Sequence, residues 1–327
     1  MNKLIGITMG DPAGVGPEIS LKALCNHKFT DSAIIFGTES VIRYYMELLK
    51  IKMELNVITD IQDFKAGHIN LYNVINFDFN KEQIGKVSPV AGDAAYQYIE
   101  KAIELAMNGA VGPVVTAPLN KEALHLGGHN YDGHTEIFAE LTNTKKYTMM
   151  LWSERMSVVH ISTHTALRKA CDAVKKERVV ECIDLANEVM KNLGITHPKI
   201  AVAGLNPHSG EAGIFGTEEI EEIEPAIREK QTEGIDVSGP VPPDTVFLKA
   251  AHGQYDIVVA MYHDQGHIPM KLLAFDDGVN VTLGLPIIRT SVDHGTAFDI
   301  AGKGIAKDTS MVAALDLALR FKENMNK

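Results

Sequence analysis

The sequence predicts an α/β protein built from parallel βαβ units. Short runs of β-branched and other apolar residues alternate with segments in which apolar residues recur every three or four positions. Such alternation is typical of a parallel sheet covered by helices. At 327 residues the chain has room for about two domains. No linker rich in Ser and Pro separates two halves, so two domains would share a continuous sheet or a tight junction.

The elements of this fold can be placed in order along the chain. Strands are expected over residues 4–9, 33–36, 113–116, 148–152, 157–162, 199–203, 257–261, 279–283 and 287–290. The clearest helix is expected over about residues 90–108 and the next over 176–193, because each places its apolar residues on one face: Ala95, Ile99, Ala102, Ile103 and Ala106 in the first, and Val179, Cys182, Ile183, Ala186 and Val189 in the second. Helices are also expected over 217–233, with Thr217 as N-cap, and over 309–324.

The composition excludes several classes of protein. No run approaches the roughly eighteen apolar residues of a membrane span, and the first residues resemble a strand more than a signal peptide. The net charge of −11, without a basic cluster, argues against binding to nucleic acid. Three cysteines without a CxxC pair argue against a disulfide framework or a thiolate zinc site. A cytoplasmic location is therefore the expectation.

The first glycine-rich turn, GDPAGVGPE at residues 10–18, follows a strand and precedes a helix that Pro17 can start. It matches neither GxGxxG nor GxxxxGK[ST], so it predicts neither a Rossmann nucleotide site nor a phosphate loop. Two interpretations remain open, a tight strand-to-helix turn and a loop that faces a ligand.

Three of the thirteen histidines follow apolar strands or stand in turn-rich loops: His164, His208 and His263. The carboxyl ends of strands in an α/β sheet gather at one edge, so ligands distant in sequence can meet there. Three neutral imidazoles with an open position would suit a catalytic divalent metal. For each histidine taken alone, a hydrogen-bonded loop residue is the favoured interpretation, because His is common in such places. The strand-end context that all three share favours the metal site.

A second set of side chains suggests anion binding. Lys271, Asn280 and Arg289 follow His263 along the chain, and His134 with Thr135 stands at a predicted helix start, where free N–H groups can receive an anion. The alternatives are solvated surface charges and simple capping by Thr135. Arg289, however, follows the apolar segment LPII, where a buried guanidinium would need an anionic partner.

Asp244, in PVPPDTVF, and Asp264, beside His263, are carboxylates in the same loop neighbourhoods. Each could act as a base, orient a histidine or cap a helix, and spacing does not separate these roles.

Long motifs taken together resemble the 4-hydroxythreonine-4-phosphate dehydrogenase family over nearly the whole chain: GDPAGVGPE, TAPLNKEAL, DGHTE, STHTALR, GLNPHSGE, PPDT, YHDQGH and NVTLGLPIIRTSVDHGTAFDIAGKG. The family is similar in fold to isocitrate and isopropylmalate dehydrogenases rather than to Rossmann enzymes. The resemblance implies two α/β/α domains, which we expect to comprise residues 1–125 with 265–327 and residues 126–264. It also implies a homodimer whose active site lies in the cleft at the subunit interface.

Carried over motif by motif, the resemblance gives each candidate residue a role. It makes His164, His208 and His263 ligands of one divalent metal (Zn, Mg, Mn or Co), the third donated across the dimer. Substrate contacts, several of them to a phosphate, would be His134, Thr135, Lys271, Asn280 and Arg289. NAD would lie against HGTAFDIAGKG, at His294, Gly295, Thr296, Ala297 and Asp299. Lys271, Asp244 or Asp264 would handle protons.

The chain departs from the pyridoxal phosphate branch of the family at two motifs, reading HTALR where that branch has HxPLR and HDQGHIPMKLL where it has a shorter apolar form. These variants resemble the branch that oxidises 4-phospho-D-threonate or 4-phospho-D-erythronate. The expected reaction is NAD-linked oxidation at C3 followed by decarboxylation. The alternatives are the 4-hydroxythreonine 4-phosphate substrate, a three-histidine metallohydrolase, which would leave HGTAFDIAGKG without a purpose, and a non-catalytic binding protein.

Overall fold

The computed structural model describes residues 4–26 and 29–325, and these divide into two compact units. The first comprises the chain up to Lys145 and the segment Leu285–Glu323, and the second contains Lys146–Gly284. The sequence-based boundaries, at 125/126 and 264/265, both lie earlier. The difference arises because helix α5 (His134–Leu141) packs against helix α3 (Pro89–Met107) of the first unit, whereas helix α10 (His263–Leu273) packs against strand β7 (Ser157–His160) of the second.

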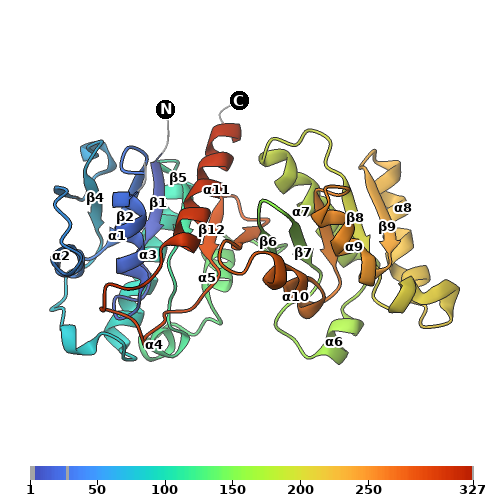
Figure 1. Cartoon of the computed structure of the whole chain (residues 1–327), viewed down its shortest axis with the longest axis horizontal. Coiled ribbons are helices and arrows are strands. Elements are labelled where there is room, and N and C mark those ends of the chain that lie inside the picture. Colours follow the sequence, from blue (N-terminus) through green and yellow to red (C-terminus); the bar gives the residue numbers. More distant parts are fainter. Residues whose placement is uncertain (1–3, 27–28, 326–327) are drawn as a thin grey trace. The chain divides into compact units, whose positions relative to one another are not determined.

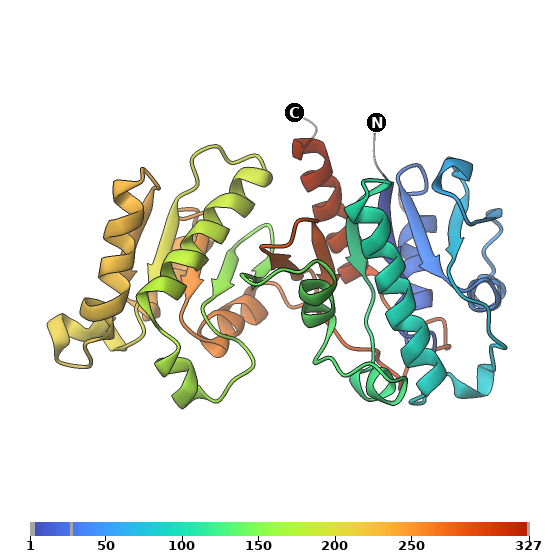
Figure 2. The same cartoon turned by 180° about the vertical axis from the view of Figure 1, so that it is seen from behind.

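The first unit holds a parallel six-stranded sheet in the order β3-β4-β2-β1-β5-β12. Its strands are β1 (Leu4–Thr8), β2 (Ala33–Gly37), β3 (Leu55–Ile58), β4 (Ile69–Asn73), β5 (Val111–Thr116) and β12 (Arg289–Val292). Its helices are α1 (Gly16–Asn26), α2 (Glu39–Leu48), α3 (Pro89–Met107), α4 (Lys121–Leu126), α5 (His134–Leu141) and α11 (Thr309–Met325), with short 3-10 turns at Ile61–Asp63 and Lys81–Gln83. As Figure 1 and the reverse view in Figure 2 show, α1 and α11 cover one face of the sheet and α3 covers the other.

The second unit holds a mixed sheet in the order β11-β6-β7-β10-β8-β9, in which β6 is antiparallel to both neighbours. Its strands are β6 (Thr148–Trp152), β7 (Ser157–His160), β8 (Ile200–Ala203), β9 (Val237–Val241), β10 (Ile257–Ala260) and β11 (Val279–Leu283). Its helices are α6 (Leu167–Asp172), α7 (Lys176–Asn192), α8 (Glu224–Thr232), α9 (Pro243–Ala251) and α10 (His263–Leu273), with a 3-10 segment at Pro207–Gly213 and a π-turn at Glu219–Ile223. Helices α7 and α8 cover one face, and α9 and α10 cover the other (Figure 1, Figure 2).

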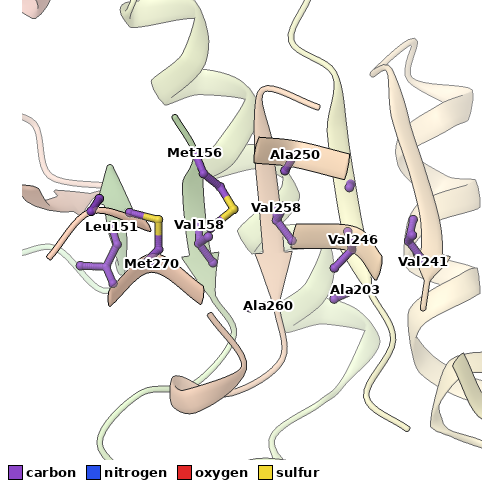
Figure 3. Packing of buried hydrophobic residues seen from close by; sticks show 12 residues of the cluster. Leu151, Met156, Val158, Ala203, Val241, Val246, Ala250, Val258, Ala260 and Met270 are labelled. Carbon is purple, nitrogen blue, oxygen red and sulfur yellow. The ribbon is translucent and has the colours of Figure 1, made fainter. Parts of the chain in front are cut away.

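The core of the second unit lies between its sheet and the helices α9 and α10 (Figure 3). Val158 and Val258, neighbours on β7 and β10, are fully buried there and meet Val246 and Ala250 from α9 and Met270 from α10. Each buried side chain of this size contributes about 1.5–3 kcal/mol relative to an exposed one. The packing fixes α10 against the sheet, which matters because α10 begins at His263.

The α/β fold class predicted from the sequence is confirmed, and both helix faces named from periodicity are buried. Every predicted strand is present, although the last runs over Arg289–Val292 instead of 287–290. Three strands were missed: β3, β4 and β9. Strand β9, VSGPV, contains Gly and Pro, which disfavour a strand except at a sheet edge, and β9 ends the order of its sheet.

One predicted helix differs at its start. The segment expected to begin at an N-cap Thr217 opens instead with the π-turn, whose N-cap is Glu218 without a side-chain capping bond, and becomes α-helical only at Glu224. Among the described residues, no helix is long and apolar enough to cross a bilayer.

Gly92 provides a test of the packing between α3 and α4. A Cβ built at this helical glycine lies 1.9 Å from the carbonyl oxygen of Ala123, a backbone atom that cannot move aside cheaply. We therefore expect Gly92→Ala to destabilise the protein by about 1–3 kcal/mol, although Ala is the better helix former by up to about 1 kcal/mol. The thermal unfolding midpoint is the measurement.

The matched control is Glu100→Ala, on the exposed side of the same helix. It should change stability by no more than about 0.5 kcal/mol. A Gly92→Ala midpoint at or above that of the unmodified protein would show that helix propensity outweighs the contact.

Candidate active site

The three histidine-bearing loops leave one edge of the second sheet. Strand β10 lies between β7 and β8 and is parallel to both, with Val258 opposite Val158 on one side and Ala201 on the other. His263 follows β10, and the loops after β7 and β8 carry His164 and His208. The strand-end convergence inferred from the sequence therefore has its physical basis in these two parallel pairings.

His164 and His263 line a common pocket of about 530 Å³, which also includes Thr163, Tyr262 and Asp264. The centroids of the two imidazole rings are 5.8 Å apart. The Nδ1 of His263 lies 2.6 Å from Oδ1 of Asp264. If Nδ1 carries the proton for this bond, Nε2 is the nitrogen with a lone pair for a metal. Of the three roles considered for Asp264, the observed contact favours orienting a histidine.

His208 does not line this pocket and lies in an unusual turn. Residues 208–212 all have positive φ values of 43–79°, and all but Gly210 carry a side chain. Such left-handed backbone costs about 1–2 kcal/mol per non-glycine residue, so neighbouring structure must hold it in place. The buried carboxylate of Glu219 does so at the start of the turn by accepting the N–H groups of Leu205 and Asn206 at 2.8 and 2.7 Å.

The donor set within one chain therefore fits a metal only in part. Two imidazoles, from His164 and His263, share a pocket in an arrangement compatible with a metal that accepts nitrogen ligands. His208 is not among the residues that line that pocket. Over residues 4–26 and 29–325, no three His, Cys, Asp or Glu side chains come together as a metal site.

Two further histidines, His267 and His160, lie next to His263 on the side toward the protein core. His267 stacks on His263, with ring centroids 3.6 Å apart and planes at 11°, and its Nδ1 lies 3.0 Å from the His263 carbonyl oxygen. His160 lies behind it, 4.7 Å between centroids, and is fully buried. Burial, helped by the proximity of His267, lowers the pKa of His160 to about 3, so its ring is neutral at neutral pH.

In the first unit, Arg289 is buried at the start of β12. Its Nη2 and Nε donate to the hydroxyl of Thr116 at 2.9 and 3.3 Å, Nη1 approaches the hydroxyl of Thr135 at 3.4 Å, and the Phe138 ring lies 5.5 Å away. Burial lowers the pKa of Arg289 to about 9, against the opposing influence of Glu136. The group remains a cation at neutral pH and would gain from a bound anion.

His134 opens α5 next to this guanidinium, and its Nε2 is buried without a hydrogen-bond partner. Burial lowers the pKa of His134 well below its ordinary value, and the positive charge of Arg289 lowers it further. A neutral imidazole has one N–H, and a hydrogen bond with the Ala117 backbone also acts on this ring, so Nε2 can donate to a ligand only in the tautomer that places the proton there. His134, Thr135 and Arg289 are therefore brought together, as the sequence predicted, at a helix N-terminus that favours negative charge.

Asn280 and Lys271, the other predicted substrate contacts, belong to the second unit. Asn280 donates from Nδ2 to the sulfur of Met149 at 2.8 Å, whereas its Oδ1 is buried and has no partner. Lys271 lies on α10 with its ammonium 5.5 Å from the Phe275 ring. The buried carbonyl of Asn280 is the polar atom here that a ligand could satisfy.

The two glycine-rich segments of the first unit pack against each other. Val15 donates its N–H to the carbonyl of Thr296 at 3.0 Å, and a Cβ on Gly14 would lie 3.0 Å from the Thr296 side chain. Gly10, with φ of 72°, would clash through a Cβ with the carbonyl of Pro118 at 2.4 Å. These glycines are thus required by contacts within the protein, which favours the tight-turn interpretation of residues 10–18.

Glu18 and Lys22 hold the end of the second glycine-rich segment through hydrogen bonds. Neither residue was predicted from the sequence as part of the site. The buried Glu18 carboxylate accepts the N–H groups of Gly304 and Ala306, and Lys22 donates to the carbonyls of the same two residues and to Glu18. The signal available in the sequence was the i,i+4 spacing of an acid and a base after the first glycine-rich turn.

Part of the predicted cofactor segment is open to a ligand. His294 is exposed, and a Cβ on Gly295 would meet nothing within 4 Å, so space is available beside the backbone there. Ala297 has a φ of 44°, which turns the chain sharply before Asp299. This open, bent backbone fits a flat ligand lying against it.

Asp244 lies in the first turn of α9, whose N-cap is Pro242. The capping role considered for Asp244 is therefore wrong, because the helix begins one residue earlier than the side chain, at Pro243. Its roles as a base or as an orienting group stay predictions.

Comparison with known proteins identifies the family. The family model of the pyridoxal phosphate biosynthetic protein PdxA matches residues 29–318. A protein named D-threonate 4-phosphate dehydrogenase from Pectobacterium atrosepticum is 51% identical over 325 residues, covering 98% of this chain and all of the relative. The protein of the same name from Salmonella typhimurium is 49% identical over 323 residues, covering 98% and 99% of the two chains.

A crystal structure of 4-hydroxythreonine-4-phosphate dehydrogenase from Klebsiella pneumoniae superimposes with a TM-score of 0.89 at 46% identity, covering 98% of this chain and 99% of that one. The family model, the two relatives and the crystal structure each match this chain over nearly its full length. The chain belongs to the PdxA family.

Proposed function

We propose that the protein is a dehydrogenase that oxidises a 4-phosphorylated four-carbon hydroxy acid, D-threonate 4-phosphate in the first place. The observation that carries the proposal is the similarity, at about half of all positions and from end to end, to relatives named for that activity. The second candidate is 4-hydroxythreonine 4-phosphate, favoured by the name of the structural neighbour. The two substrates differ in a hydroxyl or amino group at C2.

The phosphate is proposed to bind at the start of α5. Arg289 supplies a buried cation, and the free N–H groups of the first turn with Thr135 supply donors. His134, whose Nε2 has no partner within the protein, completes the set. Such remote binding orients the reacting carbon, so its loss should lower turnover as well as affinity.

A divalent metal and NAD are proposed as the reactive groups. When bound, the metal would supply a Lewis acid at the C3 hydroxyl, and NAD would supply the acceptor of the hydride. Oxidation at C3 places a ketone β to the carboxylate, which then leaves as carbon dioxide. Asp264 holds His263 with Nε2 available. Lys271 and Asp244 are the candidates for moving protons, since Asp264 is engaged with the imidazole. The open backbone at His294–Asp299 is the proposed NAD site.

A homodimer with a shared active site is part of the proposal. Two observations support it: the predicted metal ligands are incomplete within one chain, and α10 and the segment just after it expose large apolar side chains. Ile268, Leu272 and Phe275 are 57%, 82% and 74% exposed, an arrangement typical of a surface that a partner covers. A cytoplasmic location is also proposed, and the three free cysteines are consistent with it.

The substrate is best tested with a panel assayed for NADH formation with an added divalent metal. We expect kcat/KM to be highest for 4-phospho-D-threonate, followed by 4-phospho-D-erythronate and then 4-hydroxythreonine 4-phosphate. Unphosphorylated D-threonate should react at least about 100-fold less efficiently, because a charged phosphate contact is worth roughly 3 kcal/mol or more in total.

Two outcomes would contradict these assignments. A preference for 4-hydroxythreonine 4-phosphate would assign the chain to pyridoxal phosphate synthesis. Equal kcat/KM for phosphorylated and unphosphorylated D-threonate would remove the phosphate role of Arg289.

The metal assignment is tested by His208→Ala. Loss of one of three imidazole ligands should abolish NADH formation with added metal, because too few ligands remain to hold the ion. His252→Ala, which removes an exposed imidazole at the end of α9, is the matched control and should retain full activity. Near-normal turnover of His208→Ala would show that this residue is not a ligand.

The shared site is tested by mixing two inactive subunits, His164→Ala and His263→Ala. If His263 is donated across a dimer, co-expression assembles heterodimers in which one site has all its ligands, and activity returns. If His164 and His263 serve the same site from one chain, as their common pocket also permits, no heterodimer contains an intact site. Light scattering of the unmodified protein gives the oligomeric state independently.

A further inference from the structure

Three aromatic rings stack where α3 meets the loop that leads into α5. The ring of Tyr96, on α3, lies nearly parallel to that of His129, with centroids 3.8 Å apart and planes at 11°. It is also stacked with the ring of Tyr131, at 6.0 Å and 13°. His129 and Tyr131 belong to residues 127–133, which join α4 to α5. None of the three rings was predicted from the sequence as part of the site.

Hydrogen bonds join the same loop to the three helices around it. Nε2 of His129 lies 2.8 Å from Oδ1 of Asp93 on α3. The hydroxyl of Tyr131 donates to Oε1 of Glu140 on α5 at 3.1 Å, and the carbonyl oxygen of Tyr131 lies 2.8 Å from Nε2 of His125 on α4. The loop is therefore attached to α3, α4 and α5 through the side chains and backbone of two residues.

The start of the loop is fixed in a different way, by backbone contacts. A Cβ built at Gly127 would lie 2.7 Å from the backbone nitrogen of Asp93, so the chain passes as close to α3 as a glycine allows. His129 then donates its N–H to the carbonyl of Leu124 at 3.1 Å. Beyond this point the N–H of Tyr131 bonds two residues back, to His129, and the path to α5 depends on the side-chain contacts.

The first turn of α5 is not fixed by the helix itself. Its N-cap is Gly133, which has no side chain to cap it, and the first helical bond, from the N–H of Ile137 to the carbonyl of Gly133, is 3.4 Å long. That length exceeds the ordinary range for such a bond. Ile137 and Phe138 are fully buried and anchor the middle of the helix. The start, with His134 and Thr135, therefore depends on the chain that precedes it.

We propose that Tyr131 and His129, stacked on Tyr96, are positioning residues that hold the first turn of α5 ready for the phosphate of the substrate. The inference rests on the proposed phosphate site and adds residues that act through the helix start. The N–H groups of a first turn bind an anion together only when they are ordered, and ordering them during binding costs conformational entropy. The stack provides this order in advance, because Tyr131 precedes His134 by three residues.

The size of the effect has an upper bound. Phosphate can order a loosened helix start by itself, so the affinity falls by no more than the lost contacts contributed to holding it. One stacked aromatic pair corresponds to about a two- to tenfold change in an equilibrium constant. The coupling is reciprocal, so bound phosphate should also slow amide exchange in residues 129–137.

The test is the affinity of the purified protein for inorganic phosphate, measured by calorimetry, together with deuterium exchange of the peptide 129–137. Tyr131→Leu removes the stacked ring, whereas Tyr131→Phe keeps the ring and loses the hydroxyl. We expect Tyr131→Leu to bind phosphate about two- to tenfold more weakly and to exchange faster in this peptide. Tyr131→Phe should remain close to the unmodified protein. His129→Leu, which removes the neighbouring ring, should change both measurements in the same direction as Tyr131→Leu.

Two control variants assign the measured effects to their place in the protein. Arg289→Met removes the buried cation and should abolish phosphate binding, which shows that the calorimetry reports the start of α5. Phe79→Leu removes an aromatic pair elsewhere in the first unit, since the rings of Phe79 and Tyr44 lie 5.4 Å apart. It should lower the thermal midpoint and leave the phosphate affinity unchanged.

The outcomes separate the inference from the function on which it rests. Phosphate binding that is absent, or that persists in Arg289→Met, would refute the phosphate site and with it the inference. Unchanged affinity in a folded Tyr131→Leu would overturn the positioning role while the phosphate site stands. Equal weakening in Tyr131→Leu and Tyr131→Phe would overturn stacking as the mechanism. Thermal midpoints show which variants are folded, and His129→Leu keeps the test decisive if Tyr131→Leu is not.

Discussion

The parallel pairing of β10 with β7 and β8 is the constraint on which the candidate metal site depends. It aligns three strand ends, so loops distant in sequence leave the same edge of the sheet. The close contact at Gly266 then sets the depth of α10 on that sheet, and the depth decides where the His263 ring lies relative to His164. A methyl group added at Gly266 would meet His160 and Val158 of β7, so α10 could keep its place only if one of these groups moved.

In the first unit, charged side chains rather than close packing hold the glycine-rich segment 294–306 in position. Residues 294–306 form no helix or strand, and the backbone hydrogen bonds within the segment are turn bonds among Ala297, Ile300, Ala301 and Lys303. Glu18 and Lys22 bind both N–H and carbonyl groups of Gly304 and Ala306, and the N–H of Val15 holds Thr296. The segment is thus attached at both ends to the first glycine-rich turn and the helix after it. Gly295 lies near one of these attachments, and its open side is where a ligand can approach.

Periodicity and strand-end placement predicted most of the fold, because the long helices α3 and α7 bury one face each and the central strands are continuous apolar runs. Periodicity did not predict β9, because its Gly and Pro disfavour a strand and are tolerated only at the edge of the sheet. It also predicted a helix capped by Thr217, where the structure has a π-turn. Within the site, the sequence brought His134, Thr135 and Arg289 together correctly. It could not show that His208 lies in a left-handed turn and does not line the pocket of His164 and His263, because positive φ values at non-glycine residues cannot be predicted reliably from the sequence.

Several candidate site residues carry a buried polar atom that has no hydrogen-bond partner. Leaving a buried donor or acceptor without a partner costs about 1–3 kcal/mol, and folded proteins contain few such atoms. In the described part of the chain, three of them belong to candidate site residues or a direct neighbour: His134 Nε2, Asn280 Oδ1, and Ser209 Oγ beside His208. The strained turn at His208 adds a further cost at the same site. A core selected for stability alone would have replaced such groups with apolar ones of similar shape, so their presence at the predicted ligands is what a site built to receive polar groups from outside the chain requires.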